Sequence, residues 1–187
     1  ISEIDTSDIN EIDESGDIQS APQYTVTPAN YNQYFSNSGV LLSKVNDGDI
    51  ICLSGEFTGK NFVINKNITI FGSGSTIRDG TVKIEASGSG TTVCDLVIRN
   101  NKDSCQGIYL NAASNCNIYD NDIFNIGIAS YPIFLNAGSN FNTIARNTLE
   151  TEGTTYGHGT RSTSVIVLNG ANNNYIAENT VFADDES

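Results

Sequence analysis

The sequence contains no methionine and no tryptophan, and it has only three prolines, one histidine and nine lysines and arginines in 187 residues. So few bases cannot form the basic patch that nucleic acid or an anionic membrane surface requires. One histidine, and four cysteines without a CxxC spacing, argue against a zinc site. No apolar run reaches the length of a membrane span, and no signal peptide is visible. We therefore expect no nucleic-acid partner, no membrane insertion, no metal and no cofactor.

Negative charge is concentrated at the two ends. Residues 1–20 contain seven acidic residues and no base, and the last four residues contain three more acids. Removing these ten from the net charge of −13 leaves −3, so the rest of the chain is nearly balanced. This acidity favours solubility and indicates no particular partner. Because the chain begins at Ile1 and lacks methionine, we interpret it as a processed product or an excised segment, as expected of a secreted protein without its leader.

The cysteines leave two alternatives open. Their even number is compatible with two disulfides in one of three pairings, and buried free thiols are equally compatible. The residues concerned are Cys52, Cys94, Cys105 and Cys116.

An internal repeat with a period of roughly 25 residues, within the range typical of solenoids, dominates the sequence. Each copy has a short alternating strand that ends in Leu-Asn, then a small polar turn, then the pattern I-x-x-N-x-[ILV]. The Leu-Asn pairs are Leu110-Asn111, Leu135-Asn136 and Leu168-Asn169, and the second interval is longer than the first. The second pattern is Ile118, Asn121, Ile123, then Ile144, Asn147, Leu149, then Ile176, Asn179, Val181. One repeat earlier, Val93, Leu96 and Ile98 follow the same template, and Ile68 and Ile70 begin the repeat before that.

Short strands at this period, separated by Gly, Asn and Ser turns, are typical of a solenoid whose coils bury their apolar faces against each other. The sequence predicts an all-β fold, a right-handed parallel β-helix, because parallel crossovers are almost always right-handed. A leucine-rich horseshoe would need helix-forming stretches, which the repeats lack. Ile118, Ile144 and Ile176 should stack in one inward column. Asn121, Asn147 and Asn179 should form a ladder with left-handed backbone angles that satisfies neighbouring amides.

The N-terminal part of the body differs from the repeats. Thr27 and Pro28 suit the start of a helix, and Tyr31, Tyr34 and Phe35 then fall on one helical face. We predict a short capping helix that covers the open end of the stack. The chain is thus divided into an acidic tail (1–23), a capping helix with its lead-in segment (24–47), the parallel β-helix (48–183) and an acidic end (184–187).

One family resemblance is carried by residues 24–83. The segments YTVTPANYNQYFSNSG and NDGDIICLSGEFTGKNFVINKNITIFGSGSTI, followed by N-x-x-I-x-x-N-x-I turns, resemble the adhesin-like surface proteins of methanogenic archaea. The similarity extends over roughly 24–183. It implies a secreted, cell-wall-associated right-handed β-helix and supplies no catalytic residues.

An enzyme is the alternative that the fold class raises, because parallel β-helices include pectin lyases and polygalacturonases. Asp95 and Asp120 occupy the same repeat position one coil apart, near the separation of the two carboxylates in a retaining glycosidase. Arg146 and Glu178 continue that column, so the charges alternate in sign as in a solvated surface ladder. The paired aspartates and His-Gly signature of polygalacturonases are absent, and two carboxylates are too few for calcium. We expect no catalysis.

Three surface features are candidates for contact with partners. The polar segment 150–164 lengthens one repeat by eight residues and contains Tyr156, His158 and Arg161, a candidate ligand-binding loop or a plain insertion. Strand alternation places Tyr109, Phe134 and Val167 on the outside as an interaction strip. Asn67 begins one glycosylation sequon, Asn67-Ile68-Thr69, at the start of a core strand.

These features predict a non-catalytic extracellular module for cell-surface adhesion or scaffolding, whose partner is a surface glycan or another cell-surface protein. A self-assembling head-to-tail filament is the first alternative, because five isoleucines punctuate the acidic tail and could pack as an extra strand. They are Ile1, Ile4, Ile9, Ile12 and Ile18. A β-helical polysaccharide lyase or glycoside hydrolase is the second alternative.

Overall fold

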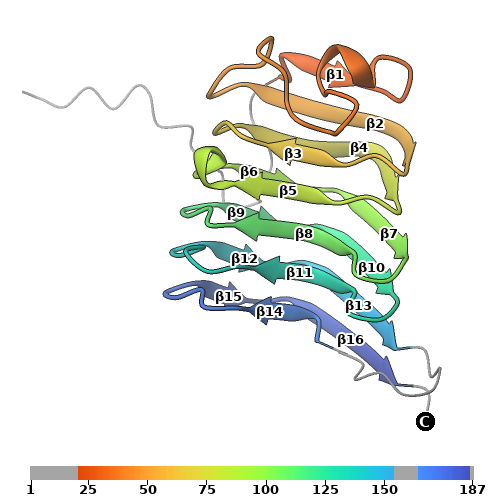
Figure 1. Ribbon diagram of the computed structural model, residues 1–187, viewed down its shortest axis with the longest axis vertical. Coiled ribbons are helices and arrows are strands. Elements are labelled where there is room, and N and C mark those ends of the chain that lie inside the picture. The colour runs from red at the N-terminus through yellow and green to blue at the C-terminus, as the bar shows by residue number, and fades with distance from the viewer. Residues whose placement is uncertain (1–20, 154–163, 186–187) are drawn as a thin grey trace, which may run out of the picture.

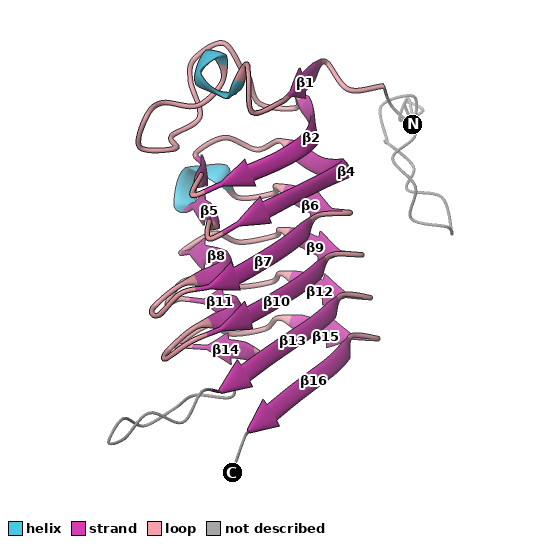
Figure 2. Ribbon diagram, turned by 90° about the vertical axis from the view of Figure 1, so that its right-hand side faces the viewer, coloured by secondary structure: helices cyan, strands magenta, loops and turns pink. Residues whose placement is uncertain are grey.

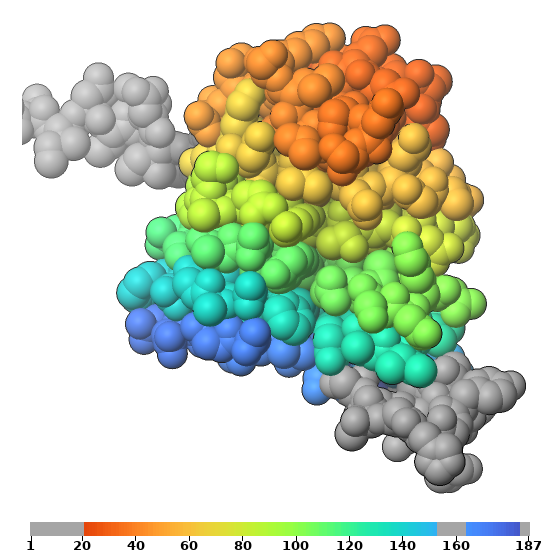
Figure 3. Space-filling model, viewed as in Figure 1, coloured from red at the N-terminus to blue at the C-terminus, as the bar shows by residue number. Residues whose placement is uncertain are grey.

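The computed structural model describes residues 21–153 and 164–185. The chain is all-β, and every pairing between its named strands is parallel. The strands follow one another in stacked coils (Figures 1 and 2) and form an 11-stranded and a five-stranded sheet. This arrangement is compatible with a β-helix or a related solenoid. In a space-filling view the coils appear as successive bands from one end of the body to the other (Figure 3).

The strands fall into three stacks. The first contains β6 (Thr92–Cys94), β9 (Asn117–Tyr119), β12 (Thr143–Ala145) and β15 (Tyr175–Ala177). The second contains β7 (Val97–Asn101), β10 (Asp122–Ile126), β13 (Thr148–Gly153) and β16 (Thr180–Asp185). The third is the five-stranded sheet of β3 (Phe62–Ile64), β5 (Val82–Glu85), β8 (Gln106–Asn111), β11 (Tyr131–Leu135) and β14 (Ile166–Leu168).

Two longer strands, β2 (Ile50–Thr58) and β4 (Thr69–Arg78), pair with each other, and β4 joins the first two stacks into one sheet. The early part of β4 pairs with β6 and its late part pairs with β7. The register of β2 shifts between Leu53 and Gly55, where Gly55 has a φ of +97° that a side chain would oppose. A short strand, β1 (Tyr24–Val26), pairs with β2 at the N-terminal end.

The predicted inward column is confirmed. Ile144 is the register partner of both Ile118 and Ile176. Toward the N-terminus the column continues through Val93 and Ile70. Ile118 and Ile144 are completely buried, and Ile176 in the last coil is exposed. A second aliphatic column runs through Ile77, Ile98, Ile123, Leu149 and Val181. Aliphatic residues fill these positions because each coil can bury its apolar face only against its neighbours.

The predicted asparagine ladder is also present, with one correction. The side-chain oxygens of Asn147 and Asn179 accept the backbone N–H of Asn121 and Asn147, respectively, at 3.0 and 2.9 Å. The left-handed backbone does not belong to these asparagines. It belongs to the residue before each, in the column Asp95, Asp120, Arg146 and Glu178, where φ lies between 54° and 57°. That residue makes the turn, and the asparagine that follows satisfies the amides the turn leaves open.

A second ladder was not predicted. Asn142 accepts the backbone N–H of Cys116 at 2.8 Å, and Asn174 accepts that of Asn142 at 2.9 Å. The residue before each is again left-handed: Asn115, Phe141 and Asn173. Both ladders lie where a coil changes direction, so each corner is held by side-chain amides.

The predicted capping helix is wrong. Residues 27–35 form turns and one 3-10 turn, η1 (Tyr31–Gln33), because the side chain of Asn30 binds the backbone of Thr27 and Thr25. Such local side-chain bonds compete with helical ones. A second 3-10 turn, η2 (Ala86–Gly88), follows β5.

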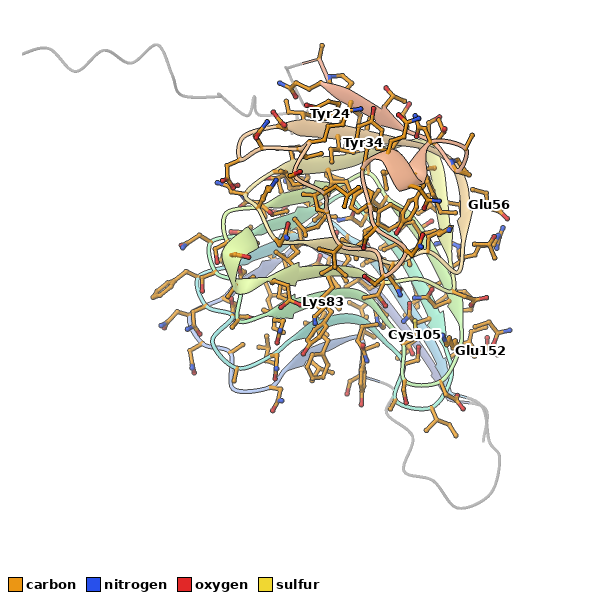
Figure 4. The ribbon with its side chains drawn as sticks, turned by 45° about the horizontal axis from the view of Figure 1, so that its top comes forward. Tyr24, Tyr34, Glu56, Lys83, Cys105 and Glu152 are labelled. Atoms are coloured by element: carbon orange, nitrogen blue, oxygen red, sulfur yellow. The ribbon has the colours of Figure 1, made fainter. Side chains whose placement is uncertain are left out.

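Aromatic packing still closes the core at the N-terminal end. Tyr31 stacks on Phe35 with ring centroids 5.2 Å apart, and both rings meet Phe62 edge-on. Burial raises the pKa of Tyr31 to about 12. Tyr24 and Tyr34 lie beside each other with centroids 5.3 Å apart (Figure 4). The predicted aromatic face is therefore buried without the predicted helix.

The cysteine alternatives are decided in favour of free thiols. Cys52, Cys94, Cys105 and Cys116 are all unpaired and buried. Burial raises the pKa of each thiol, to about 11 for Cys116. These cysteines belong to the packing of the core and turns.

The lengthened repeat leaves the strand register intact. Ile108 pairs with Ile133, and Ile133 pairs with Ile166, although a longer stretch of chain separates the second pair. The segment predicted to bulge, 150–164, begins inside β13, which extends to Gly153, so the additional residues follow that strand. Tyr156, His158 and Arg161 fall in 154–163, outside the described residues.

Candidate binding face

An aromatic strip runs across the outer surface of the five-stranded sheet. Tyr109, Phe134 and Val167 are register partners on β8, β11 and β14, as the alternation of the strands predicted. All three are half-buried. The rings of Tyr109 and Phe134 meet edge-on at 5.5 Å, and Tyr131 packs against Phe134 at 5.6 Å. The strip is thus a continuous apolar surface over neighbouring coils.

A basic residue ends the strip on β5. Lys83 is the register partner of Tyr109, and its ammonium nitrogen lies 5.4 Å from the centroid of that ring. Lys83 also forms a 2.6 Å ion pair with Glu85 (Figure 4 marks Lys83). Burial raises the pKa of Glu85, but hydrogen bonds from Lys83 and Asn111 and the charge of Lys83 outweigh it, so the net shift is downward. Glu85 is therefore an ionised acceptor at neutral pH.

A polar column lies beside the strip, and we name it the outer amide ladder. Its members are Glu85, Asn111, Asn136 and Asn169. Each asparagine donates its side-chain N–H to the oxygen of the residue one coil earlier, at 2.7, 3.3 and 3.1 Å. The hydroxyl of Tyr109 also reaches Asn111, at 3.3 Å, which connects the ladder to the strip.

The outer amide ladder retains hydrogen-bonding capacity. A carboxamide has two N–H donors and an oxygen with two lone pairs. Within the described chain, Asn136 uses one N–H toward Asn111 and one lone pair toward Asn169. One donor and one acceptor therefore remain for solvent or a ligand. Aromatic rings beside repeated amides suit a ligand that has apolar faces and many hydroxyl groups.

The enzyme hypothesis was based on the charged column of Asp95, Asp120, Arg146 and Glu178, which contains an ion pair. Arg146 donates from Nε and Nη2 to the two carboxylate oxygens of Asp120, at 3.0 and 2.7 Å. The charge of Glu178 also acts on Arg146, as the predicted alternation of signs requires. A retaining glycosidase needs one carboxyl group free to donate a proton, whereas both Asp120 oxygens accept bonds from a guanidinium.

Asn67 lies outside the strand in which it was expected. The strand β4 begins at Thr69, and Asn67 occupies an exposed turn before it. Its backbone N–H donates to Asp47 at 2.7 Å. Asn67 is exposed whereas Ile68 of the sequon is buried, and glycosylation there stays a prediction.

Sequence analysis missed several residues of this face. Lys83 and Glu85 occupy the repeat positions of Tyr109 and Asn111 one coil earlier, but Ile-Glu replaces the Leu-Asn pair there, so the template was not extended to them. Tyr131 was not used, although it pairs with Gln106 one coil earlier. Asn111, Asn136 and Asn169 were used only as markers of the repeat. Because each follows an inward leucine, alternation already placed its side chain outside.

No protein-family model matches this chain, and neither a curated protein nor a solved structure matches it. In residues 21–153 and 164–185 no group of three or more His, Cys, Asp or Glu side chains is arranged to hold a metal ion. Over the same ranges no helix is long and apolar enough to cross a membrane.

Proposed function

We propose that this chain is a non-catalytic adhesion or scaffold module of a cell surface, built as a right-handed parallel β-helix. The observation that carries the proposal is the aromatic strip beside the outer amide ladder. Together they present rings, and amides that keep some hydrogen-bonding capacity, at the spacing of successive coils, about 4.8 Å. The ligand class that fits this chemistry is a surface glycan, whose sugar rings have apolar faces and whose hydroxyl groups both donate and accept hydrogen bonds.

A rigid frame supports this role. Tyr109 and Phe134 stand on strands whose inward neighbours, Ile108 and Leu135 among them, are completely buried. Side chains on such strands hold their positions better than side chains on loops, so little ordering is needed when a ligand binds. The secreted, wall-associated location is part of the proposal and follows from the resemblance of residues 24–83 to adhesin-like proteins.

The absence of catalysis is proposed from the ion pair between Asp120 and Arg146. A guanidinium that binds both oxygens of a carboxylate occupies the atoms that would have to contact a substrate. The candidate carboxylates at Asp95 and Asp120 therefore fit a surface ladder better than an acid and nucleophile pair.

One panel of plant and microbial glycans tests the proposal in two measurements, of binding and of turnover. In the first use, an array measures binding to the intact chain, and at least one glycan should be retained. In the second use, reducing ends and the absorbance of unsaturated products measure turnover, which should stay at background. Turnover that Asp95→Asn or Asp120→Asn abolishes would replace this proposal with the enzyme.

A further inference from the structure

The binding face, meaning the aromatic strip together with the outer amide ladder, runs along the axis of the coil stack (Figure 1). Lys83, Tyr109 and Phe134 are successive register partners on β5, β8 and β11, and Glu85 pairs with Asn111 in the column beside them. Neighbouring strands lie about 4.8 Å apart. The face therefore repeats one side chain of each column at that distance, once per coil.

Each strand is too short to present the same pattern along its own direction. On β8 the outward side chains are those of Tyr109 and Asn111, because the alternate position before them is Gly107. On β11 and just after it, Phe134 and Asn136 occupy the same two positions. A ligand laid across the sheet would meet one strip residue and one amide of each strand, whereas a ligand laid along the axis meets a new pair in every coil.

The free hydrogen-bonding groups of the ladder are mainly donors. Asn111 uses one side-chain N–H toward Glu85, and its oxygen accepts from the Tyr109 hydroxyl and from Asn136. Since a carboxamide has two donors and two lone pairs, one N–H of Asn111 remains among the described residues. Asn136 likewise keeps one N–H and one lone pair. The ladder thus offers one N–H per coil to a ligand that carries an acceptor oxygen in every repeat.

The binding face carries no net charge. Lys83 and Glu85 form an ion pair of 2.6 Å at one end of it. The other members of both columns are uncharged: Tyr109, Phe134, Val167, Asn111, Asn136 and Asn169. The chain as a whole has a net charge of −13. A polyanionic glycan would find Lys83 already paired and would be repelled by the chain, so the ligand that fits is uncharged.

We propose that the binding face holds an uncharged, extended chain of β-1,4-linked sugars along the stack axis, with one sugar per coil. This inference rests on the proposed glycan binding and specifies its ligand. Both linkages of a ring in such a chain are equatorial, so the chain is nearly straight and each sugar advances it by roughly one coil spacing, about 4.8 Å. An α-1,4-linked chain has one axial linkage per ring and curls, so it leaves the register within a few sugars.

The substituents of the sugars fit both columns. When the hydroxyl groups are equatorial, as in glucose, the two faces of the ring carry only C–H groups, which contact the rings of Tyr109 and Phe134. The hydroxyl and ring oxygens lie along both edges. Successive sugars turn opposite edges toward the ladder, and each edge supplies an oxygen that accepts the free N–H of Asn111 or Asn136.

A length series on the unaltered full chain tests the axial arrangement. Calorimetry with cello-oligosaccharides of two to six sugars should show the affinity rising by about threefold or more per added sugar, as expected from one further contact. The rise should end near four sugars, the number of register positions in the strip: Lys83, Tyr109, Phe134 and Val167. Maltohexaose is the α-1,4-linked control with the same composition as cellohexaose, and it should bind about tenfold more weakly or worse.

Removing one ladder donor tests the role of the amides. Asn136→Asp keeps the shape of the side chain but replaces its N–H groups with an oxygen, so the affinity for cellohexaose should fall by about fivefold or more. Asn117→Asp introduces the same charge on β9, outside the binding face, and is the matched control that should leave the affinity unchanged. Circular dichroism of both variants checks that the coils stay folded.

The outcomes separate this inference from the proposed function. If the unaltered chain binds no glycan, both are wrong. If it binds a glycan but binds cellohexaose no more tightly than cellobiose, or no more tightly than maltohexaose, the glycan-binding module stands and the axial β-1,4-linked chain is overturned. Equal affinities of Asn136→Asp and Asn117→Asp for cellohexaose overturn the contact with the ladder.

Discussion

The side-chain oxygen of Asn147 accepts a hydrogen bond of 3.0 Å from the backbone N–H of Asn121, 26 residues earlier in the sequence. Asn147 also donates its side-chain amide to the carbonyls of Ile118 and Ala145, at 2.9 and 3.0 Å. Both asparagines are 1% exposed, so water cannot replace these bonds. The turn leaves buried backbone groups without backbone partners. One side-chain amide per coil supplies the missing hydrogen bonds.

We predict that Asn147→Ala lowers the free energy of unfolding by about 2–4 kcal/mol. The substitution leaves the buried N–H of Asn121 and two carbonyls without this partner, and an unsatisfied buried group costs about 1–3 kcal/mol. Urea denaturation followed by circular dichroism measures the change. Thr148→Ala, at the next and exposed position, should change stability by less than about 0.5 kcal/mol. Equal effects of the two variants would show that the ladder does not stabilise the corner.

Phe141 has a left-handed backbone that suits phenylalanine poorly, and replacing this residue should stabilise the protein. It has a φ of 59°, and its side chain is 61% exposed. Its column neighbours Asn115 and Asn173 have the same left-handed backbone with a residue type that tolerates it. Phe141→Asn should raise the free energy of unfolding by about 0.5–1 kcal/mol. Tyr175→Asn, at a similarly exposed site without a positive φ, is the control and should bring no gain.

The thiols should resist modification in the folded protein. All four cysteines are buried, and burial raises the pKa of each above that of a free thiol. Because the thiolate is the reactive form, a thiol reagent at pH 8 should label almost none of them until urea unfolds the chain. Rapid labelling of the native protein, counted by mass spectrometry, would contradict the buried positions.

Stability should fall at alkaline pH for the same reason. The pKa of Cys116 is raised from 9.0 to about 11 in the folded protein. The folded state therefore keeps a proton that the unfolded state releases, so unfolding becomes easier as the pH rises from about 9 to 11. Below pH 9 this group leaves stability unchanged. Urea midpoints at pH 8 and pH 10.5 measure the decline, and Cys116→Ala should reduce it.

Ile144→Asp should unfold the domain. The residue is completely buried between Ile118 and Ile176, and an unpaired buried charge costs a large share of the roughly 5–15 kcal/mol that stabilises a domain. Ile128→Asp, at an exposed isoleucine, is the matched control and should stay folded. Circular dichroism and thermal melting distinguish the two outcomes.

The sequence predicted those parts of the fold that depend on periodicity. Every coil repeats the same inward position, so the sequence placed Ile118, Ile144 and Ile176 in one column. Three asparagines follow these isoleucines at a constant spacing and could be placed in a second column: Asn121, Asn147 and Asn179. Strand alternation likewise placed Tyr109 and Phe134 outside. Local spacing could not show which residue of each turn is left-handed, since Arg146 and Glu178 are unusual residue types for that backbone.

Features that depend on long-range contacts were predicted less well. The helical pattern of Tyr31, Tyr34 and Phe35 indicated a helix, but Asn30 and the rings around Phe62 determine the backbone there. The spacing of Cys94 and Cys116 could not distinguish thiols from a disulfide. Asn142 and Asn174 could have been recognised, because the interval between them equals that between Ile144 and Ile176.

The most direct test of the proposed function compares the affinities of the unaltered chain and of Phe134→Ala for a glycan selected on the array. Phe134 is central to the aromatic strip, in contact with both Tyr109 and Tyr131. Removing its ring should weaken binding, measured by calorimetry, by about fivefold or more, equivalent to about 1 kcal/mol of aromatic contact. Phe141→Ala removes an exposed ring at a corner away from the strip and should leave the affinity unchanged. Equal affinities of the unaltered chain and Phe134→Ala would contradict the assignment of this face as the binding site.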